Sequence, residues 1–160
     1  MKKTLIALSV VLILTSLVIS MTVFVSADTV YSGTSGGLTW NFNETRGELT
    51  ISGEGNMMDF PFLSASEWDI YSSKIKSVKI EEGVTSIGDY SFSLFKSLTS
   101  VTIPSTVERI GMNAFHYCTS LKNITIPSSV SEIDVSSFSS WIGGKGSDLP
   151  LFYCSQFQVG

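Results

Sequence analysis

The sequence predicts a mainly β solenoid, a stack of three 23-residue repeats with a β-hairpin cap at its N-terminal end. The first observation is that six apolar positions recur three times at this interval. They are Ile75, Val78, Ile80, Val84, Ile87 and Phe92, then Leu98, Val101, Ile103, Val107, Ile110 and Phe115, then Leu121, Ile124, Ile126, Val130, Ile133 and Phe138. The second is that apolar and polar residues alternate in short runs, as in half-buried strands. The third is a pair of such runs ahead of the repeats, joined by a turn that contains glycine.

Each repeat is predicted to contain one short strand. In the second copy, Val101 and Ile103 face inward and Thr102 faces outward, because side chains alternate along a strand. Pro104 has no N–H for a ladder and therefore ends the strand. The period of 23 residues lies within the range of leucine-rich repeats, about 20–29 residues.

The rest of each repeat is expected to return the chain to the core. Val107 and Ile110 are predicted to be buried, and we expect Gly111 to permit the next bend. Stacked copies pair equivalent strands in parallel and place the large filler of each turn in one column. That column is predicted to consist of Phe92, Phe115 and Phe138.

The segment before the repeats is predicted to be a cap. Residues 28–37 are small and indicate an extended arm or linker, whereas 38–42 and 48–52 alternate and indicate a hairpin. Residues 57–73 are irregular but rich in large apolar side chains, which favours a packed loop with one helical turn near Glu67. The end of a repeat stack needs such a cover.

We therefore expect one domain over residues 28–160. It divides into an N-terminal cap (28–73), three repeats (74–143), and a C-terminal cap or tail (144–160). Residues 1–27 are basic at the start and then apolar, and Val25–Ala27 fits a signal-peptidase site. This segment is predicted to be a signal peptide, with a retained membrane anchor as the alternative because the apolar run is long.

The charge of the chain disfavours nucleic acid as a partner. Without Lys2 and Lys3, eight basic residues face fourteen acidic ones, so residues 28–160 carry a net charge of about −6. No cluster of lysine or arginine interrupts this balance, and phosphate backbones and anionic lipids are therefore poor partners. Contact with a membrane is expected only through residues 1–27, if they are uncleaved.

No catalytic or metal site and no cofactor are predicted. His116 is the only histidine and lies two residues before Cys118, but we expect a solvent-facing histidine and a cysteine that faces the core. Cys118 occupies the position of Phe95 and Trp141, which favours a buried thiol. A disulfide with Cys154 is the alternative for an exported chain. Glu81, Glu82 and Asp89 lack the spacing of a calcium loop.

The candidate binding surface is the outward face of the repeat strands. Its predicted residues are Ser77, Lys79, Ser100, Thr102, Asn123 and Thr125. Outward strand residues of stacked repeats form an extended surface on which ligands commonly bind. All of these residues are small and polar except Lys79, so plain solvation is the alternative interpretation of the same pattern.

The chain resembles the BspA-type leucine-rich repeat family of bacterial and protist surface proteins. The resemblance lies in LTSVTIPSTVERIGMNAF (98–115), KSVKIEEGVTSIGDYSF (76–92), and SGTSGGLTWNF with GELTISGEGNM (within 32–57). It implies a secreted or cell-surface protein that adheres to host proteins, such as extracellular matrix, or mediates coaggregation. Family members often have cysteine where this chain has Ser35, and many have longer arrays.

We therefore expect a non-enzymatic protein outside the cytoplasm that recognises a protein or glycan, in the manner of an adhesin. One alternative is a structural cell-envelope module that associates with itself. A second is a carbohydrate-binding accessory protein that uses Trp40, Trp68 or Trp141. That second alternative requires one of these side chains to be exposed, whereas we expect all three to be mostly buried.

Overall fold

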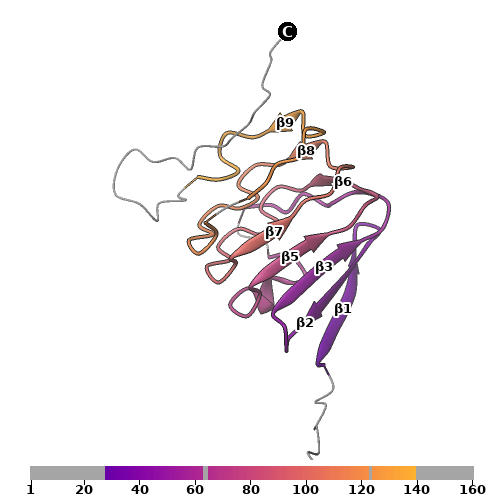
Figure 1. Cartoon of the computed structure of the whole chain (residues 1–160), viewed down its shortest axis with the longest axis vertical. Helices are drawn as coiled ribbons and strands as arrows, with labels where there is room; N and C mark the ends of the chain where they lie inside the picture. Colours follow the sequence, from indigo (N-terminus) through magenta and orange to yellow (C-terminus); the bar gives the residue numbers. More distant parts are fainter. Residues whose placement is uncertain (1–27, 63–64, 123, 140–160) are drawn as a thin grey trace, which may run out of the picture.

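A computed structural model describes residues 28–62, 65–122 and 124–139 of the chain (Figure 1). These residues form nine strands and one short 3₁₀ helix, η1 (Asp69–Tyr71), so the predicted mainly β class is confirmed. Over the same ranges, no helix has the length and hydropathy needed to cross a bilayer. The predictions for 1–27, Asn123 and 144–160 lie outside the described residues.

The first sheet joins the cap to the repeats. Its strand order is β1-β2-β3-β5-β7, antiparallel from β1 to β3 and parallel from β3 to β7. The strands are β1 (Val30–Ser35), β2 (Leu38–Asn43), β3 (Glu48–Ser52), β5 (Ser77–Ile80) and β7 (Ser100–Thr102). The predicted hairpin corresponds to β2 and β3, and η1 is the helical turn predicted for the loop before the repeats.

The prediction of an extended arm over residues 28–37 was wrong, because most of this segment is strand β1. Gly36 and Gly37 have φ values of 58° and 94° and make a two-residue turn into β2. The absence of a side chain at Gly33 lets the Trp40 ring lie against the β1 backbone, 2.8 Å from where a Cβ would stand. Small residues here serve close packing.

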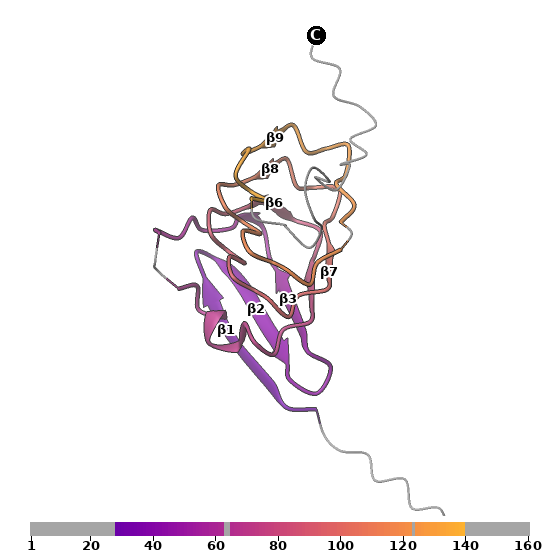
Figure 2. The same ribbon diagram turned by 90° about the vertical axis from the view of Figure 1, so that its left-hand side faces the viewer.

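A second, parallel sheet has the order β4-β6-β8-β9, and the sequence analysis did not predict it. Its strands are β4 (Gly55–Asn56), β6 (Val84–Ile87), β8 (Arg109–Ile110) and β9 (Glu132–Ile133). Ile87 pairs with Ile110 and Ile110 with Ile133, so the register repeats every 23 residues. Figures 1 and 2 show these strands one above another along the molecule.

Gly111 does not serve the bend that we expected, because its φ is not positive. A Cβ at this position would lie 2.2 Å from Asp89 Oδ1 and 2.7 Å from the Asp89 nitrogen. The residue is therefore glycine because the preceding turn approaches its backbone closely. Val107 and Ile110 are buried, as predicted.

The predicted column of aromatic rings forms the centre of the core. Phe92 and Phe115 stack with their centroids 5.4 Å apart, and Phe115 and Phe138 stack at the same distance. Trp68 extends the column into the cap, at 5.9 Å from Phe92. Its indole Nε1 donates a hydrogen bond of 2.9 Å to the Ser91 carbonyl.

The third copy departs from the predicted pattern. No strand is assigned over its described residues 124–127, so the first sheet ends at β7, whereas β9 continues the second sheet. Ile124 and Ile126 are only partly buried, although both pack against the core.

Candidate functional site

Four of the six predicted binding residues lie in register on two neighbouring strands. Ser77 pairs with Ser100 and Lys79 with Thr102, across β5 and β7. Ser77 is half-buried and the other three are exposed. Thr125 is exposed in a segment without regular structure.

The strands of the cap extend this surface, and this extension was not predicted from the sequence. The strand registers place Ser32, Asn41, Thr50, Lys79 and Thr102 side by side, one from each strand of the first sheet. We call this line the polar row. The polar positions of 38–42 and 48–52 were the signal that could have found it. They alternate with the buried Leu38, Trp40, Phe42, Leu49 and Ile51.

Hydroxyl and amide groups dominate the polar row. Lys79 is its one charged side chain, and its Nζ forms an ion pair with Glu81 Oε1 at 2.9 Å. That hydrogen bond raises the pKa of Lys79, so its ammonium group stays protonated. The surface offers donors and acceptors for recognition, but no acid–base pair for catalysis.

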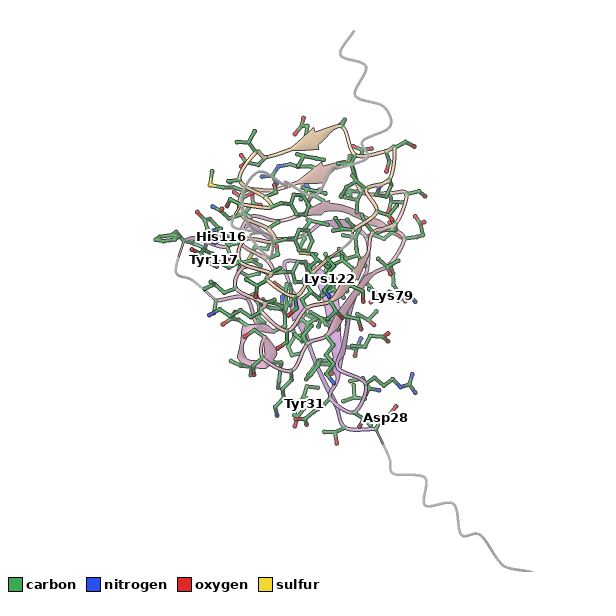
Figure 3. The ribbon with its side chains drawn as sticks, turned by 60° about the vertical axis from the view of Figure 1, so that its left-hand side comes forward. Asp28, Tyr31, Lys79, His116, Tyr117 and Lys122 are labelled. Atoms are coloured by element: carbon green, nitrogen blue, oxygen red, sulfur yellow. The ribbon has the colours of Figure 1, made fainter. Side chains whose placement is uncertain are left out.

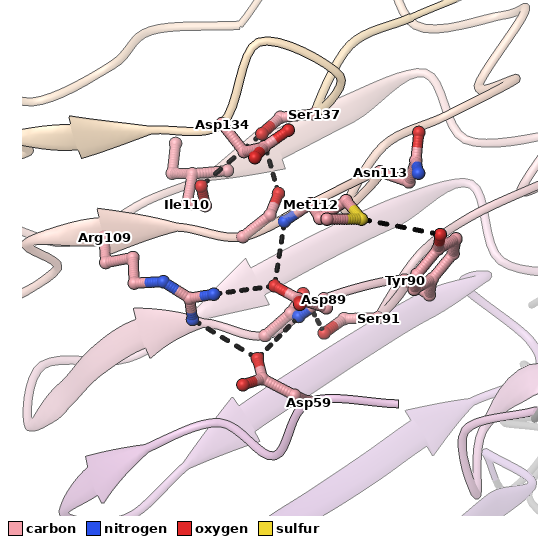
Figure 4. A network of polar contacts seen from close by, with 12 residues as sticks. Asp59, Asp89, Tyr90, Ser91, Arg109, Ile110, Met112, Asn113, Asp134 and Ser137 are labelled. Atoms are coloured by element: carbon pink, nitrogen blue, oxygen red, sulfur yellow. Dashed lines mark hydrogen bonds and ion pairs between the residues drawn. The ribbon is translucent and has the colours of Figure 1, made fainter. Parts of the chain in front are cut away.

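A polar network on the second sheet ties the cap to the repeats (Figure 4). Arg109 on β8 contacts Asp59 Oδ1 at 3.2 Å through Nη1 and Asp89 Oδ1 at 2.7 Å through Nη2. The Asp89 N–H donates to Asp59 Oδ1 at 2.8 Å, and the Met112 N–H donates to Asp89 Oδ1 at 2.8 Å. Partial burial opposes ionisation of Asp59, but these hydrogen bonds and the guanidinium together hold its pKa below the usual value.

This network has the features of a structural clamp. It joins the loop after β4, the turn after β6 and strand β8, which belong to the cap and to two successive copies. The Oδ1 atoms of Asp59 and Asp89 each accept from two N–H donors, and no group of three or more metal-ligating side chains occurs in the described part of the chain. We therefore place the candidate site elsewhere.

His116 and Cys118 do not form a nucleophile–base pair. The Cys118 side chain is fully buried and its thiol donates to the Phe92 carbonyl at 3.2 Å. Burial raises the pKa of this thiol to about 12. His116 lies at the surface, where its ring meets Tyr117 edge-on, and partial burial lowers its pKa. The predicted orientations of both residues are confirmed.

Large apolar side chains are exposed on the opposite side of the molecule from Lys79, as the positions of Lys79 and Tyr117 show in Figure 3. We call this surface the turn edge. Its exposed residues are Phe62, Leu94, Met112 and Tyr117, and the half-buried Tyr90 lies beside them. The Phe62 and Tyr90 rings lie 5.7 Å apart, and the Tyr90 hydroxyl reaches Met112 Sδ at 3.6 Å. This surface was not predicted from the sequence, because its apolar residues follow no strand alternation.

The backbone of the turn edge is strained at places that recur every 23 residues. Tyr90 and Asn113 have φ values of 56° and 51°, and Leu94 and Tyr117 have 66° and 56°. Residues other than glycine adopt this region rarely, and asparagine is the least disfavoured of them. A tyrosine or leucine at such a position is kept at a cost to stability.

The fold and these surfaces are those of a leucine-rich repeat protein. Residues 67–143 match the family described as "BspA type Leucine rich repeat region (6 copies)". This part of the chain belongs to the BspA-type leucine-rich repeat family, and the resemblance seen in the sequence is confirmed.

Solved structures of bacterial leucine-rich repeat proteins are similar to the chain. A leucine-rich repeat protein from Eubacterium ventriosum ATCC 27560 is 31% identical with a TM-score of 0.60, over 68% of this chain and 28% of that one. A leucine rich cell surface protein from Faecalibacterium prausnitzii A2-165 is 27% identical with a TM-score of 0.43, over 68% and 34%. The chain thus spans about a third or less of these two proteins. No curated protein sequence matches the chain.

Trp40 and Trp68 are 7% and 1% exposed, as predicted. Trp141 and Cys154 lie outside the described residues, and the Cys118–Cys154 disulfide stays untested.

Proposed function

We propose that this protein recognises a protein or glycan ligand outside the cell without catalysing a reaction, in the manner of an adhesin. Its working unit is one domain over residues 28–160, a solenoid of three repeats with an N-terminal cap and a C-terminal cap or tail, exported by the leader over residues 1–27. The observation that carries the proposal is the polar row, which crosses all five strands of the first sheet.

The candidate contacts are Ser77, Lys79, Ser100 and Thr102, with Asn123 and Thr125 as the corresponding positions of the third copy. A polar surface of this kind binds a ligand through several hydrogen bonds formed at the same time. Because the strands hold the side chains at fixed spacing, less conformational entropy is lost on binding. The net charge of about −6 excludes polyanionic ligands and leaves neutral or basic surfaces as partners.

The test is binding of protein purified after expression of the full chain to an array of matrix proteins and glycans. The test variant carries Lys79→Glu and Thr102→Glu, and a second variant adds Asn123→Glu. A matched control carries Lys96→Glu and Thr119→Glu, which make the same change in charge at exposed positions outside the strands. We expect the strand variants to lose saturable binding and the control to retain it. Equal binding by all of them would refute the strand surface as the site.

The exposed turn edge is the second candidate surface for ligand recognition. Aromatic residues and methionine are enriched in protein interfaces, and here they are kept exposed on a strained backbone. A Leu94→Ser, Tyr117→Ser variant on the same array separates the two surfaces. Loss of binding by this variant alone would assign recognition to the turn edge.

The burial of Trp40 and Trp68 weighs against the carbohydrate-binding alternative, which needs an exposed indole. The self-associating alternative predicts that the purified protein binds its own immobilised copy and nothing else on the array.

A further inference from the structure

Among the described residues, no strand pairs with the outer edge of β1, so one edge of the first sheet is open there. Strand β1 stands at the end of the strand order, and Figures 1 and 2 both show it as the outermost strand of the cap. Natural proteins protect such edges with charged residues, proline or bulges. Neither β1 (VYSGTS) nor β2 (LTWNFN) contains a charged residue or a proline, and their pairing is regular over six residues.

The hydrogen-bond phase of β1 identifies which backbone groups face outward. The Glu44 N–H donates to the Thr29 carbonyl at 2.8 Å, which marks Thr29 and Glu44 as a hydrogen-bonded pair. Such pairs alternate along antiparallel strands, so Tyr31, Gly33 and Ser35 bond to β2. The N–H and C=O groups of Val30, Ser32 and Thr34 therefore point away from the sheet.

Two polar side-chain atoms close to this edge also lack a hydrogen-bond partner. Among the described residues, the buried side-chain polar atoms without a hydrogen bond are Ser35 Oγ and Trp40 Nε1, and both belong to the β1–β2 hairpin. The indole nitrogen lies directly against Gly33. Val30 is 54% exposed and Tyr31 is 36% exposed, although both are apolar residues of a strand. Val30 and Tyr31 thus leave apolar area exposed at this edge in the described part of the chain.

We propose that β1 pairs antiparallel with β1 of a second copy of this chain, which joins the two first sheets into one. One symmetric register pairs the outward groups of all three residues, Val30, Ser32 and Thr34. Ser32 lies on the two-fold axis opposite its own equivalent, and Val30 lies opposite Thr34 of the second copy. This register forms hydrogen-bonded pairs along the whole of β1.

The side chains suit this register on both faces. On the inner face, Tyr31 lies opposite Gly33 of the second copy, against which the Trp40 ring of that copy lies, so the two aromatic rings meet there. On the outer face, only serine, threonine and valine meet. Because β1 and β2 are uncharged, the net charge of about −6 is not concentrated at the contact. A self-complementary patch is the defining property of a two-fold interface.

The first test measures mass in solution by light scattering, with protein purified after expression of the full chain. Wild type is expected to form a dimer, and Ser32→Lys to raise the dimer dissociation constant by about tenfold or more, because two like charges meet on the axis. Thr39→Lys is the matched control. It places the same charge on the same face one strand inward and is expected to leave the dimer intact.

The Ser32 amide takes no part in the β1–β2 ladder, so Ser32→Lys is expected to fold, which its thermal unfolding curve checks. A monomeric wild type, or a dimer that Ser32→Lys does not weaken, would overturn the proposal.

The second test reports the register directly. Hydrogen-bonded antiparallel pairs have Cα atoms about 5.5 Å apart, within the span of a disulfide, about 4.4–6.8 Å. Ser32→Cys, made in a Cys154→Ser background, is expected to form a covalent dimer on mild oxidation, while Thr39→Cys in that background is not. Failure of Ser32→Cys to cross-link, or equal cross-linking by Thr39→Cys, would overturn the register. A dimer through the strand surface would give the second of these outcomes, and a dimer through the turn edge would give the first.

Discussion

Trp68 stacks on Phe92 with ring centroids 5.9 Å apart, although Trp68 lies in the cap and Phe92 lies in the first repeat. The same indole donates to the Ser91 carbonyl and meets Phe60 and Trp40 of the cap edge-on. One side chain therefore connects the antiparallel and parallel parts of the core. Cap and repeats are expected to unfold together for this reason.

Replacement of Trp68 tests this connection. Trp68→Ala is expected to lower the free energy of unfolding by about 3–5 kcal/mol, because it removes a fully buried ring and leaves a cavity. The measurement is urea unfolding followed by far-UV circular dichroism. Phe62→Ala is the control, since that ring is 70% exposed and its loss should change stability by about 0.5 kcal/mol or less. Similar losses of unfolding free energy from both substitutions would contradict the role of Trp68 as the side chain that connects cap and repeats.

Gly88 is predicted to be intolerant of any side chain. A Cβ there would lie 2.0 Å from the Met58 carbonyl oxygen, which is backbone and cannot rotate away. Gly88→Ala is expected to reduce stability by about 1–3 kcal/mol, measured by thermal or urea unfolding. The control is Asp134→Ala, two repeats further on, where a larger side chain is already accommodated. A neutral Gly88→Ala would argue against the close contact between cap and repeat.

The clamp around Arg109 predicts a dependence on pH. Because the pKa of Asp59 is lower in the folded protein, its contribution is present above the unfolded value of about 3.9 and disappears as the pH falls through the folded value. Asp59→Asn is expected to reduce stability by about 1 kcal/mol or less near pH 7, because the pair is largely exposed. Below the folded pKa the two proteins should be equally stable.

Urea midpoints measured from pH 7 down to pH 2 check this prediction. Glu67→Gln is the control, because it removes an exposed carboxylate for which no ion pair occurs among the described residues. A difference between wild type and Asp59→Asn that stayed constant down to pH 2 would exclude the charge of Asp59 as its cause.

Cys118 is predicted to be unreactive in the folded, reduced protein. Burial and a pKa of about 12 leave almost no thiolate at pH 8, and thiolate is the reactive form. In a Cys154→Ser background, a chromogenic disulfide reagent should label Cys118 only as fast as the protein opens, and at once in denaturant. Rapid labelling without denaturant would show that the thiol is accessible.

The 23-residue period made the inner core predictable, because stacked copies place equivalent side chains over one another. The column from Phe92 to Phe138 and the burial of Cys118 both follow from that argument. The second sheet was harder to foresee, since β8 and β9 are two residues long and too short to show alternation. Strand β1 was missed because its glycines were interpreted as flexibility.

The candidate surfaces were predictable only where they share the repeat period. The 23-residue period directly predicts that Ser77 pairs with Ser100 and that Lys79 pairs with Thr102. The polar row could not be predicted in this way, because it also depends on the strand registers of the cap. The clamp joins Asp59, Asp89 and Arg109, whose spacings of 30 and 20 residues match no repeat. Interactions between non-equivalent positions of successive copies leave no periodic trace in a sequence.

The constant register of the parallel ladders has a consequence for how such a chain can vary. Ser77 pairs with Ser100, and Arg109 with Glu132, at the same 23-residue interval, so one more unit could be inserted between the second and third copies in the same register, with the contacts of Arg109 to the cap unchanged. Each inserted unit would lengthen the polar row by one side chain. Ligand preference could therefore change by duplication or loss of whole units while the cap, held by Trp68 and Arg109, stayed as it is.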